Sequence, residues 1–348
     1  MRVVFLIGLL HLSTGLVAQD LEVSPPQPSR DSLRDGHIQL FPNDFFIYPV
    51  LKQRTLSFEL EKADRSRLLT YRPNNTYSFG LGLYLFEVGA ELAFAIPVAE
   101  RKTELFGTSK ARDIQLNMLG KKFGLDAYYQ RYRGFYITDK DNEPGKDLPY
   151  PQRGDIISRN FGLTGSYIFN NQKFSLRSVY NFSERQIFSK GSFLALVNLG
   201  RFTLEADSSI LEPTQEVVFS NNVSFKKLRY STFSVAPGYS YNLIYRNFFL
   251  NGTLGIGPAH HWIYYQRETG AGRHETGINS FVAARIGIGY NGDRIFGGIA
   301  FLTQGSNVKF EDVRFSNNNA SFKILMGYRF KEWGKLKTRA WDQIPFKL

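Results

Sequence analysis

The residues best suited to catalysis or metal binding are the histidines. The chain has five, and His260 and His261 stand side by side shortly after Pro258. A metal site would call for the i, i+4 spacing of a helix or a nearby carboxylate motif, and neither accompanies the pair. A lipid-hydrolysing barrel needs a serine within reach of a histidine, and Ser280 with His261 is the available combination. Nothing in the neighbouring sequence demands either chemistry, so we interpret the histidines as polar interface or lumen residues. We predict no catalytic residue, metal or cofactor.

Composition narrows the classes of function further. The chain has no cysteine, which excludes disulfides, thiolate metal sites and thiol nucleophiles. Its formal net charge is +12, a balance that often indicates nucleic-acid binding. Here the basic residues are scattered along predicted strands instead of forming a patch or arm, so we predict no nucleic-acid partner.

Charged residues on the polar faces of predicted strands form the most suggestive set. The candidates for lining a lumen are Asp126, Arg177, Arg285, Lys323 and Arg329. Most of them are cationic, and a water-filled lumen lined in this way would favour anions. The alternative is that these residues pair with carboxylates or loop residues and fill a closed interior. The sequence leaves both interpretations open.

Among the strands that would position these residues, the clearest is predicted at residues 320–330. Phe322, Ile324, Met326, Tyr328 and Phe330 alternate with Lys323, Gly327 and Arg329, and this period of two predicts a half-buried strand. Little chain remains to form a soluble core for the apolar face, so we expect that face to meet lipid. The ending Gly327, Tyr328 and Phe330 resembles the carboxy-terminal signal by which barrel-assembly machinery recognises outer-membrane barrels.

Similar alternation predicts a transmembrane antiparallel β-barrel of about twelve strands. The predicted strands are 76–86, 88–97, 112–119, 122–137, 160–170, 173–182, 193–205, 230–241, 246–257, 278–290, 294–304 and 320–330. Adding 54–61 and a hidden strand at 216–225 gives fourteen, the alternative. Short connections at 170–172, 243–245 and 291–293 tend to alternate with long polar ones at 98–110, 140–157, 267–277 and 305–319, as in bacterial barrels. A soluble β-sandwich is disfavoured because its strands average about 5–6 residues.

The beginning of the chain predicts export. Arg2 and the apolar residues 3–12 precede small or polar residues 13–19, the pattern of a secretory signal peptide. No segment reaches the about 20 apolar residues of a membrane-spanning helix. We therefore divide the chain into a signal peptide (1–19), a periplasmic leader (20–53), a barrel (54–330) and a basic tail (331–348).

Several stretches within residues 45–330 resemble an uncharacterised family of Gram-negative envelope proteins, domain of unknown function 4421. They are Tyr71-Arg-Pro-Asn74 with Gly80-Leu-Gly82, residues 110–116 with Asp113, residues 128–136 with Gly134, Ala206-Asp-Ser-Ser209, Pro237-Gly-Tyr-Ser-Tyr241, and Asn247-Phe-Phe-Leu-Asn251 before Gly255-Ile-Gly257. The resemblance implies an outer-membrane β-barrel and supplies no catalytic residue.

Together these observations predict a barrel in the outer membrane of a Gram-negative bacterium that is not an enzyme. Its expected partners are outer-membrane lipid, lipopolysaccharide and, during insertion, the assembly machinery. The preferred role is a passive pore or anion-favouring channel for small solutes. The alternatives are a structural or partner-binding barrel with a plugged lumen and, less favoured, a lipid-modifying enzyme. Solute, partner and oligomeric state are not encoded in any recognisable motif.

Overall fold

The computed structural model describes residues 33–34, 36–41, 44–74, 77–85, 88–211, 219, 224–268 and 270–331. The expected signal peptide, residues 20–32 of the leader and residues 332–348 of the tail lie outside these ranges, as does nearly all of the hidden strand expected at 216–225. Within the described part of the chain, no helix is both long enough and apolar enough to cross a membrane.

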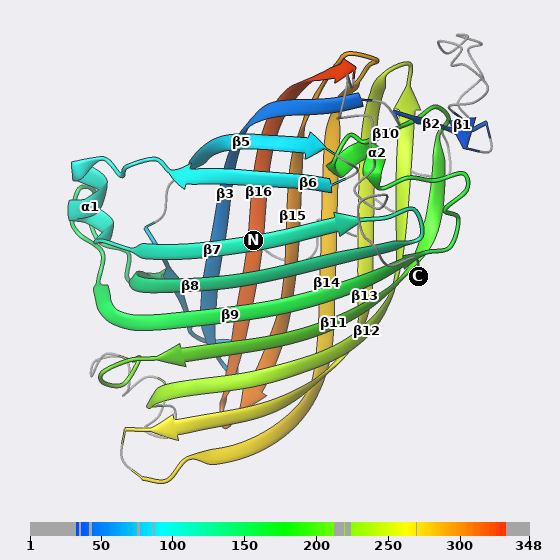
Figure 1. Ribbon diagram of the computed structural model, residues 1–348. Helices are drawn as coiled ribbons and strands as arrows, with labels where there is room; N and C mark the ends of the chain where they lie inside the picture. Colours follow the sequence, from blue (N-terminus) through cyan, green and yellow to red (C-terminus); the bar gives the residue numbers. More distant parts are fainter. Residues whose placement is uncertain are drawn as a thin grey trace, which may run out of the picture.

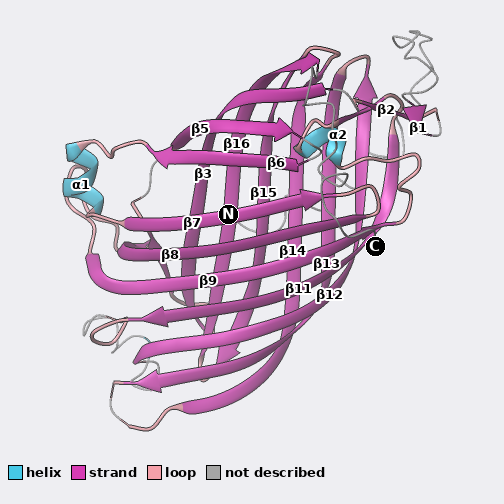
Figure 2. Ribbon diagram, viewed as in Figure 1, coloured by secondary structure: helices cyan, strands magenta, loops and turns pink. Residues whose placement is uncertain are grey.

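The chain is built almost entirely of antiparallel strands (Figures 1 and 2). In chain order the elements are β1 (Leu33–Arg34), β2 (Ile38–Leu40), β3 (Asp44–Lys62), β4 (Leu68–Arg72), β5 (Ser78–Leu85), β6 (Val88–Ala95), α1 (Glu100–Phe106), β7 (Lys110–Leu119), β8 (Phe123–Asp139), β9 (Gln152–Ile168), α2 (Arg177–Tyr180), β10 (Glu184–Gln186), β11 (Lys190–Glu205), β12 (Phe225–Tyr245), β13 (Phe248–Arg267), β14 (Arg273–Asn291), β15 (Ile295–Phe310) and β16 (Val313–Lys331).

Pairing between β3 and β16 closes the sheet into a barrel. From β3 the ring continues through β4, β8, β9 and β11 to β16, which makes ten strands. β5 and β6 branch from β3, and β7 branches from β8, so three more strands stand in the wall outside the ring (Figure 1). The all-β barrel class is therefore as predicted, whereas neither twelve nor fourteen strands is confirmed.

The branching arises because β3 and β8 each change partner along their length. β3 pairs with β5 up to Lys52 and with β4 from Phe58 onward. β8 pairs with β7 up to Arg133 and with β4 from Tyr136 onward. The change in β8 falls at Gly134, which has a positive φ of 87° and lies at a break in register. Glycine adopts this conformation without the steric cost that a side chain brings, so it permits the bulge.

One end of the barrel has short turns, at residues 120–122, 246–247 and 292–294. We call this the short-turn end and the opposite one, where the connections at 96–109, 140–151 and 206–224 lie, the long-loop end. Near the short-turn end the outer surface carries a continuous apolar belt. On β16, Ile324, Met326 and Tyr328 are exposed, whereas the alternate residues Leu325 and Arg329 are buried. The predicted orientation of the last strand is thus confirmed.

Toward the long-loop end the same strands reverse their polarity. On β16 the inward Val313 and Phe315 are 2% and 0% exposed, while the outward positions include Arg314 and Asn318. Inward apolar residues of the ring strands other than β14, with three residues of the 206–224 connection, form one core. This outer core contains 23 buried side chains, among them Phe58, Tyr71, Phe202, Phe225 and Phe310. Here the outer surface no longer meets lipid, so burial of apolar groups inside the barrel becomes favourable.

Because of this reversal, the predictions of two loops were wrong. Residues 267–277 and 305–319 were expected as long polar connections. Instead they contain the ends of β13 and β15 and the beginnings of β14 and β16, joined by short turns. Their outward residues are polar because they lie beyond the apolar belt, and polarity alone therefore suggested loops. The barrel also begins at Asp44, earlier than the expected boundary at residue 54, because 44–53 belong to β3.

A third correction concerns residues 173–182, which were expected to form a strand. The connection between β9 and β11 instead contains α2 and β10. β10 pairs with β2 of the leader in a small sheet that is separate from the sheet of the barrel wall. We call residues 170–189 the plug segment. Phe174, Leu176, Val179 and Phe182 are unevenly spaced along the segment, and all four are buried against the inner wall. Figure 1 shows α2 at the short-turn end, beside the ends of β5 and β6.

The outer core supports a quantitative prediction. Phe58 is fully buried, and its ring lies 4.5 Å from Tyr71 and 5.4 Å from Phe315 between centroids. Replacing a buried Phe by Ala usually costs about 3–5 kcal/mol, so we expect Phe58→Ala to lower the free energy of unfolding by about that amount. The matched control is Leu148→Ala in the exposed 140–151 connection, for which we expect a change within about 0.5 kcal/mol. Denaturant titration of the refolded barrel gives both values, and equal effects would contradict a packed outer core.

Candidate functional site

The lumen contains the largest collection of buried polar side chains and is the candidate site. It has three layers along the barrel. The outer core closes the long-loop end, the plug segment fills the short-turn end, and a polar layer lies between them. The polar side chains come from strands whose outward residues form the apolar belt, so alternation directs them inward.

Ion pairs cross the polar layer from one wall to the other. Asp126 on β8 pairs with Arg285 on β14, with 2.5 Å between Oδ2 and Nη2. Glu91 on β6 pairs with Lys323 on β16 and, at 3.5 Å, with Lys52 on β3. β8 and β14 lie on opposite sides of the ring, so the first pair spans the lumen, whereas the Glu91 pairs reach across β5 to β3 and to β16 beyond it.

The third carboxylate of this layer is Asp113 on β7, which pairs with Arg54 on β3. Gln130 donates to the same carboxylate at 3.2 Å and to Asn319 at 3.3 Å. The layer therefore sets four cations (Lys52, Arg54, Arg285 and Lys323) against three carboxylates (Glu91, Asp113 and Asp126). The predicted excess of inward positive charge is largely neutralised by pairing.

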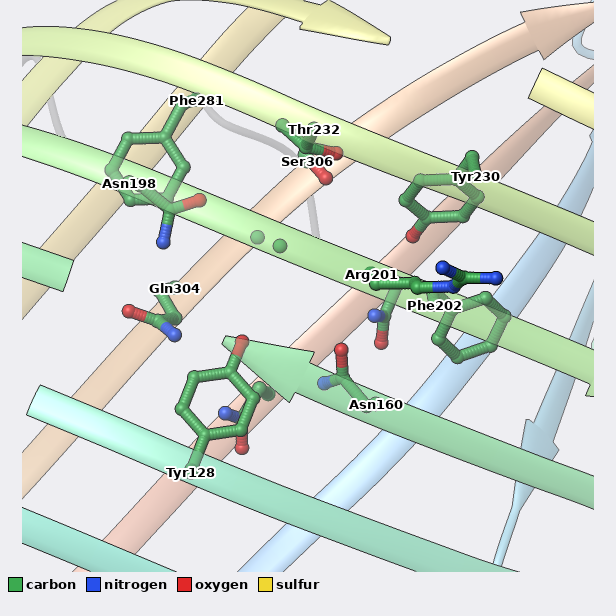
Figure 3. Close-up of a pocket in the computed structure, with 14 residues that line it drawn as sticks. Tyr128, Asn160, Asn198, Arg201, Phe202, Tyr230, Thr232, Phe281, Gln304 and Ser306 are labelled. Carbon is green, nitrogen blue, oxygen red and sulfur yellow. The ribbon is translucent and has the colours of Figure 1, made fainter. Parts of the chain in front are cut away.

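Beside this layer lies a small cavity (Figure 3). Its volume is about 30 Å³, room for only a few water molecules. Tyr128, Asn160, Asn198 and Gln304 reach the same space from β8, β9, β11 and β15. Asn198 donates to Thr164 at 2.8 Å, and Asn160 donates to Gln130 at 3.2 Å. Polar side chains thus satisfy one another's hydrogen bonds around a space that is too small for a solute to pass.

The remaining predicted lumen residues lie at the plug segment. Arg177 is in α2, and its guanidinium contacts Glu184 at 3.2 Å and donates to Tyr84 at 2.9 Å. Arg329 is fully buried and donates to the backbone carbonyls of Phe182 and Gly292. Arg329 therefore ties the final strand to the plug.

The structure separates the pair considered for lipid hydrolysis. His261 is fully buried, and its Nδ1 lies 2.9 Å from the hydroxyl of Thr232. Ser280 is exposed on the outer face of β14, opposite Pro258 in the strand pairing. The two side chains point to opposite faces of the wall, an arrangement that gives no nucleophile–base contact. Within the described part of the chain, no group of three or more potential metal ligands comes together.

Sequence reasoning missed Glu91, Asp113 and Glu184. The first two were detectable, because Glu91 alternates with Leu92 and Asp113 with Ile114 in strands that were predicted. Glu184, which is 1% exposed and accepts two bonds from Arg34 at 2.8 and 3.0 Å, lies in the irregular plug segment. No periodic signal marks it.

The family model of a domain of unknown function, DUF4421, matches residues 33–330. The chain belongs to this family. The predicted membership is confirmed, and the structure shows the β-barrel fold that the resemblance implied. The residues that carried the resemblance include Asn74 and Gly134, which Ser109 links by hydrogen bonds where β8 changes partner.

No curated protein sequence matches the chain. Among solved structures, it is similar to Ail, the attachment invasion locus protein of Yersinia pestis, in complex with sucrose octasulfate (16% identity, TM-score 0.25, covering 60% of this chain and 97% of Ail). It is also similar to the translocator domain of the autotransporter NalP from Neisseria meningitidis (9% identity, TM-score 0.32, covering 82% and 88%). A third is the toluene transporter TodX of Pseudomonas putida (8% identity, TM-score 0.22, covering 84% and 90%). Such low identities and TM-scores transfer no function.

The buried Arg329 gives a test of the plug's attachment. Lysine keeps the charge but lacks the planar fork that reaches several acceptors at once. We expect Arg329→Lys to leave the carbonyl of Phe182 without its donor and to speed amide hydrogen exchange in residues 174–186 by about tenfold or more, since a lost charge-assisted bond is worth about 1.5–3 kcal/mol. Arg294→Lys is the control, because the only hydrogen bond of its side chain among the described residues is a 3.4 Å contact to the carbonyl of Arg329. Unchanged exchange in Arg329→Lys would show that the plug is held by its apolar contacts alone.

Proposed function

We propose that the protein is a plugged barrel of the Gram-negative outer membrane that binds partners or stabilises the envelope instead of serving as a passive pore. The observation that carries this proposal is closure at both ends of the lumen. The outer core fills the long-loop end, and the plug segment fills the short-turn end. Between them, the cavity of about 30 Å³ is too small for a solute larger than water.

The two closures are attached to the wall by different means. In the outer core, Ile210, Leu211 and Phe219 of the 206–224 connection pack among inward residues of the strands. Tyr71 donates to the carbonyl of Ile210 at 2.7 Å, and Arg153 donates to that of Ser209 at the same distance. The described residues 209–211 of the connection are therefore held to the barrel by both apolar packing and hydrogen bonds.

The plug segment is held by backbone acceptors that meet donors from the wall. Asn291 donates to the carbonyls of Ser178 and Glu184 at 2.7 and 2.9 Å. Asn242 donates to the carbonyl of Ser175 at 2.9 Å. Paired in this way, the backbone of the segment avoids the cost of unsatisfied buried polar groups.

In this proposal the signal peptide directs export, and the short-turn end faces the periplasm, as short turns do in bacterial barrels. The proposed recognition site for the assembly machinery is formed by Gly327, Tyr328 and Phe330, near the end of the last strand, β16. Lipid and lipopolysaccharide surround the apolar belt. We propose no catalytic role, because the histidine and serine considered above face opposite ways.

An anion-favouring channel is the second candidate. The observation that favours it is that the plug segment is a separate piece of chain, attached to the wall partly through polar contacts and paired by β10 with β2 of the leader. Conduction would require displacement of this segment together with the 206–224 connection. The residual excess of one cation in the polar layer would then favour anions.

Planar-bilayer recording separates the two candidates. We expect the refolded mature chain to insert without discrete conductance steps. Replacing residues 171–188 by a flexible Gly/Ser linker should leave it silent, because the outer core still closes the other end. The control is a well-characterised open porin refolded in the same way. Discrete anion-selective steps from the unmodified chain would contradict the plugged barrel and support the channel, and Arg285→Glu should then weaken that selectivity.

A further inference from the structure

The wall of the barrel has one junction at which neighbouring strands are not paired. β6 pairs only with β5, and β7 pairs only with β8. Within the described residues no backbone pairing joins β6 to β7, although Figure 1 shows them successive in the near wall. Unpaired backbone groups cost several kcal/mol each in hydrocarbon. This β6–β7 junction must therefore be shielded or supplied with polar atoms from outside the sheet.

The junction is held in place at its long-loop end. The side chain of Asn74 donates to the carbonyls of Lys102 and Gly107 in the connection that carries α1, at 3.1 and 2.7 Å. The backbone N–H of Asn74 donates to Ser109, whose hydroxyl donates to the carbonyl of Gly134. These contacts fix the connection from β6 to β7, just before β7 begins, to the point where β8 changes partner, so the discontinuity is a built feature of the wall.

The outer surface beside the junction is strongly apolar. Leu92 and Phe94 on β6 are 66% and 69% exposed, and Ile114 on β7 is 68% exposed. On the opposite side of the barrel, Ile286 on β14 is 54% exposed. The junction is therefore flanked by side chains well suited to acyl chains.

The inner surface beside the junction is charged. Glu91 and Asp113 of the two unpaired strands face Lys52, Arg54 and Lys323 from β3 and β16. Three cations against two carboxylates leave one positive charge without a match. Lys52 has the weakest contact, 3.5 Å to Glu91, and an ammonium group carries three donors. The ammonium group of Lys52 is therefore able to donate a hydrogen bond to an additional anionic oxygen.

The depth of these cations matches a lipid headgroup. Lys52 lies opposite Lys323 in the pairing of β3 with β16. On β3 the outward face changes from apolar Leu51 to polar Gln53 on either side of Lys52, whereas on β16 it becomes polar only at Asn318. Lys52 thus stands where the outer surface of β3 passes from hydrocarbon to the polar interface, where phosphate groups of lipids lie, and Lys323 lies directly across from it.

We infer that the β6–β7 junction is a lateral binding site for one phosphate-bearing membrane lipid. The phosphate reaches through the junction to Lys52 and Lys323, and the acyl chains lie along Leu92, Phe94 and Ile114. A peptide strand would satisfy the same backbone edges. The unmatched positive charge and the large exposed apolar side chains favour a molecule with an anionic head and apolar tails. This inference goes beyond the proposed function and holds whether or not the lumen conducts.

Native mass spectrometry of the detergent-solubilised full chain tests the inference directly. We expect dioleoyl phosphatidylglycerol to bind with one tight equivalent, dioleoylglycerol to bind weakly, and free glycerol phosphate to compete poorly. Lys52→Gln leaves the Lys323–Glu91 pair intact and should weaken phosphatidylglycerol binding by about tenfold, whereas Lys140→Gln, an exposed residue beyond the belt, should not. Equal binding of the two lipids, or equal affinity in both variants, would overturn the inference. Strong competition by glycerol phosphate would identify a phosphate site without a lipid requirement and would also overturn it.

Photo-crosslinking locates the site without altering any charge. A diazirine-bearing amino acid at position 114 should capture phosphatidylglycerol more efficiently than one at position 286, because both positions face lipid but only the first adjoins the junction. Lys52→Gln should reduce capture at 114 to the level at 286. Equal capture at both positions in the parent chain would mean that only bulk lipid is present. A peptide adduct at 114 in cell envelopes, in place of lipid, would assign the junction to a partner strand and refute the lipid site.

Discussion

The structure depends on a change of solvent along each strand. Near the short-turn end the outside of the wall meets hydrocarbon, so apolar residues face out and polar ones face in. Beyond the belt the outside meets water, and apolar residues face in. β11 shows the change within a few residues, since Val197 and Leu199 are exposed outward and Phe202 and Leu204 are buried inward. Successive side chains still point alternately outward and inward. Beyond the belt, however, the apolar residues are the inward ones and the polar residues the outward ones.

This exchange explains why the lumen is closed. In the belt, inward polar residues must satisfy one another, because pairing removes most of the cost of burying them. Asp126 with Arg285 and Asn198 with Thr164 are examples. Beyond the belt, the inward apolar residues bury each other as in a soluble protein. Both regimes favour a filled interior, and the plug segment adds Phe182 and Val179 at the other end.

Much of this architecture was predictable from the sequence, and each failure has its own physical origin. The final strand, the alternation of Phe79 and Leu81 outward on β5 and the inward direction of Asp126 follow from period-two patterns with apolar residues on the outer face. Residues 305–319 were misassigned as a loop because the apolar face there, including Val308 and Phe315, points inward. The plug segment was misassigned because Phe174, Leu176 and Phe182 by chance continue the alternation of a strand. The pairing of Lys323 with Glu91 was beyond prediction, since it joins residues 232 positions apart through the closure of the barrel.

The branching of the wall follows from the same closure. The ring of ten strands is complete where β4 lies between β3 and β8. In the belt, β5, β6 and β7 stand between those two strands instead. A wall that contains more strands at one level than at another must contain a point at which pairing is interrupted. Asn74 and Gly134 define that point from two sides, one through hydrogen bonds to the α1 connection and the other through a backbone conformation that releases β8 from β7. The interruption is therefore a consequence of joining a wider belt to a narrower outer barrel, and the charged residues behind it stand where such a wall is most open to the membrane.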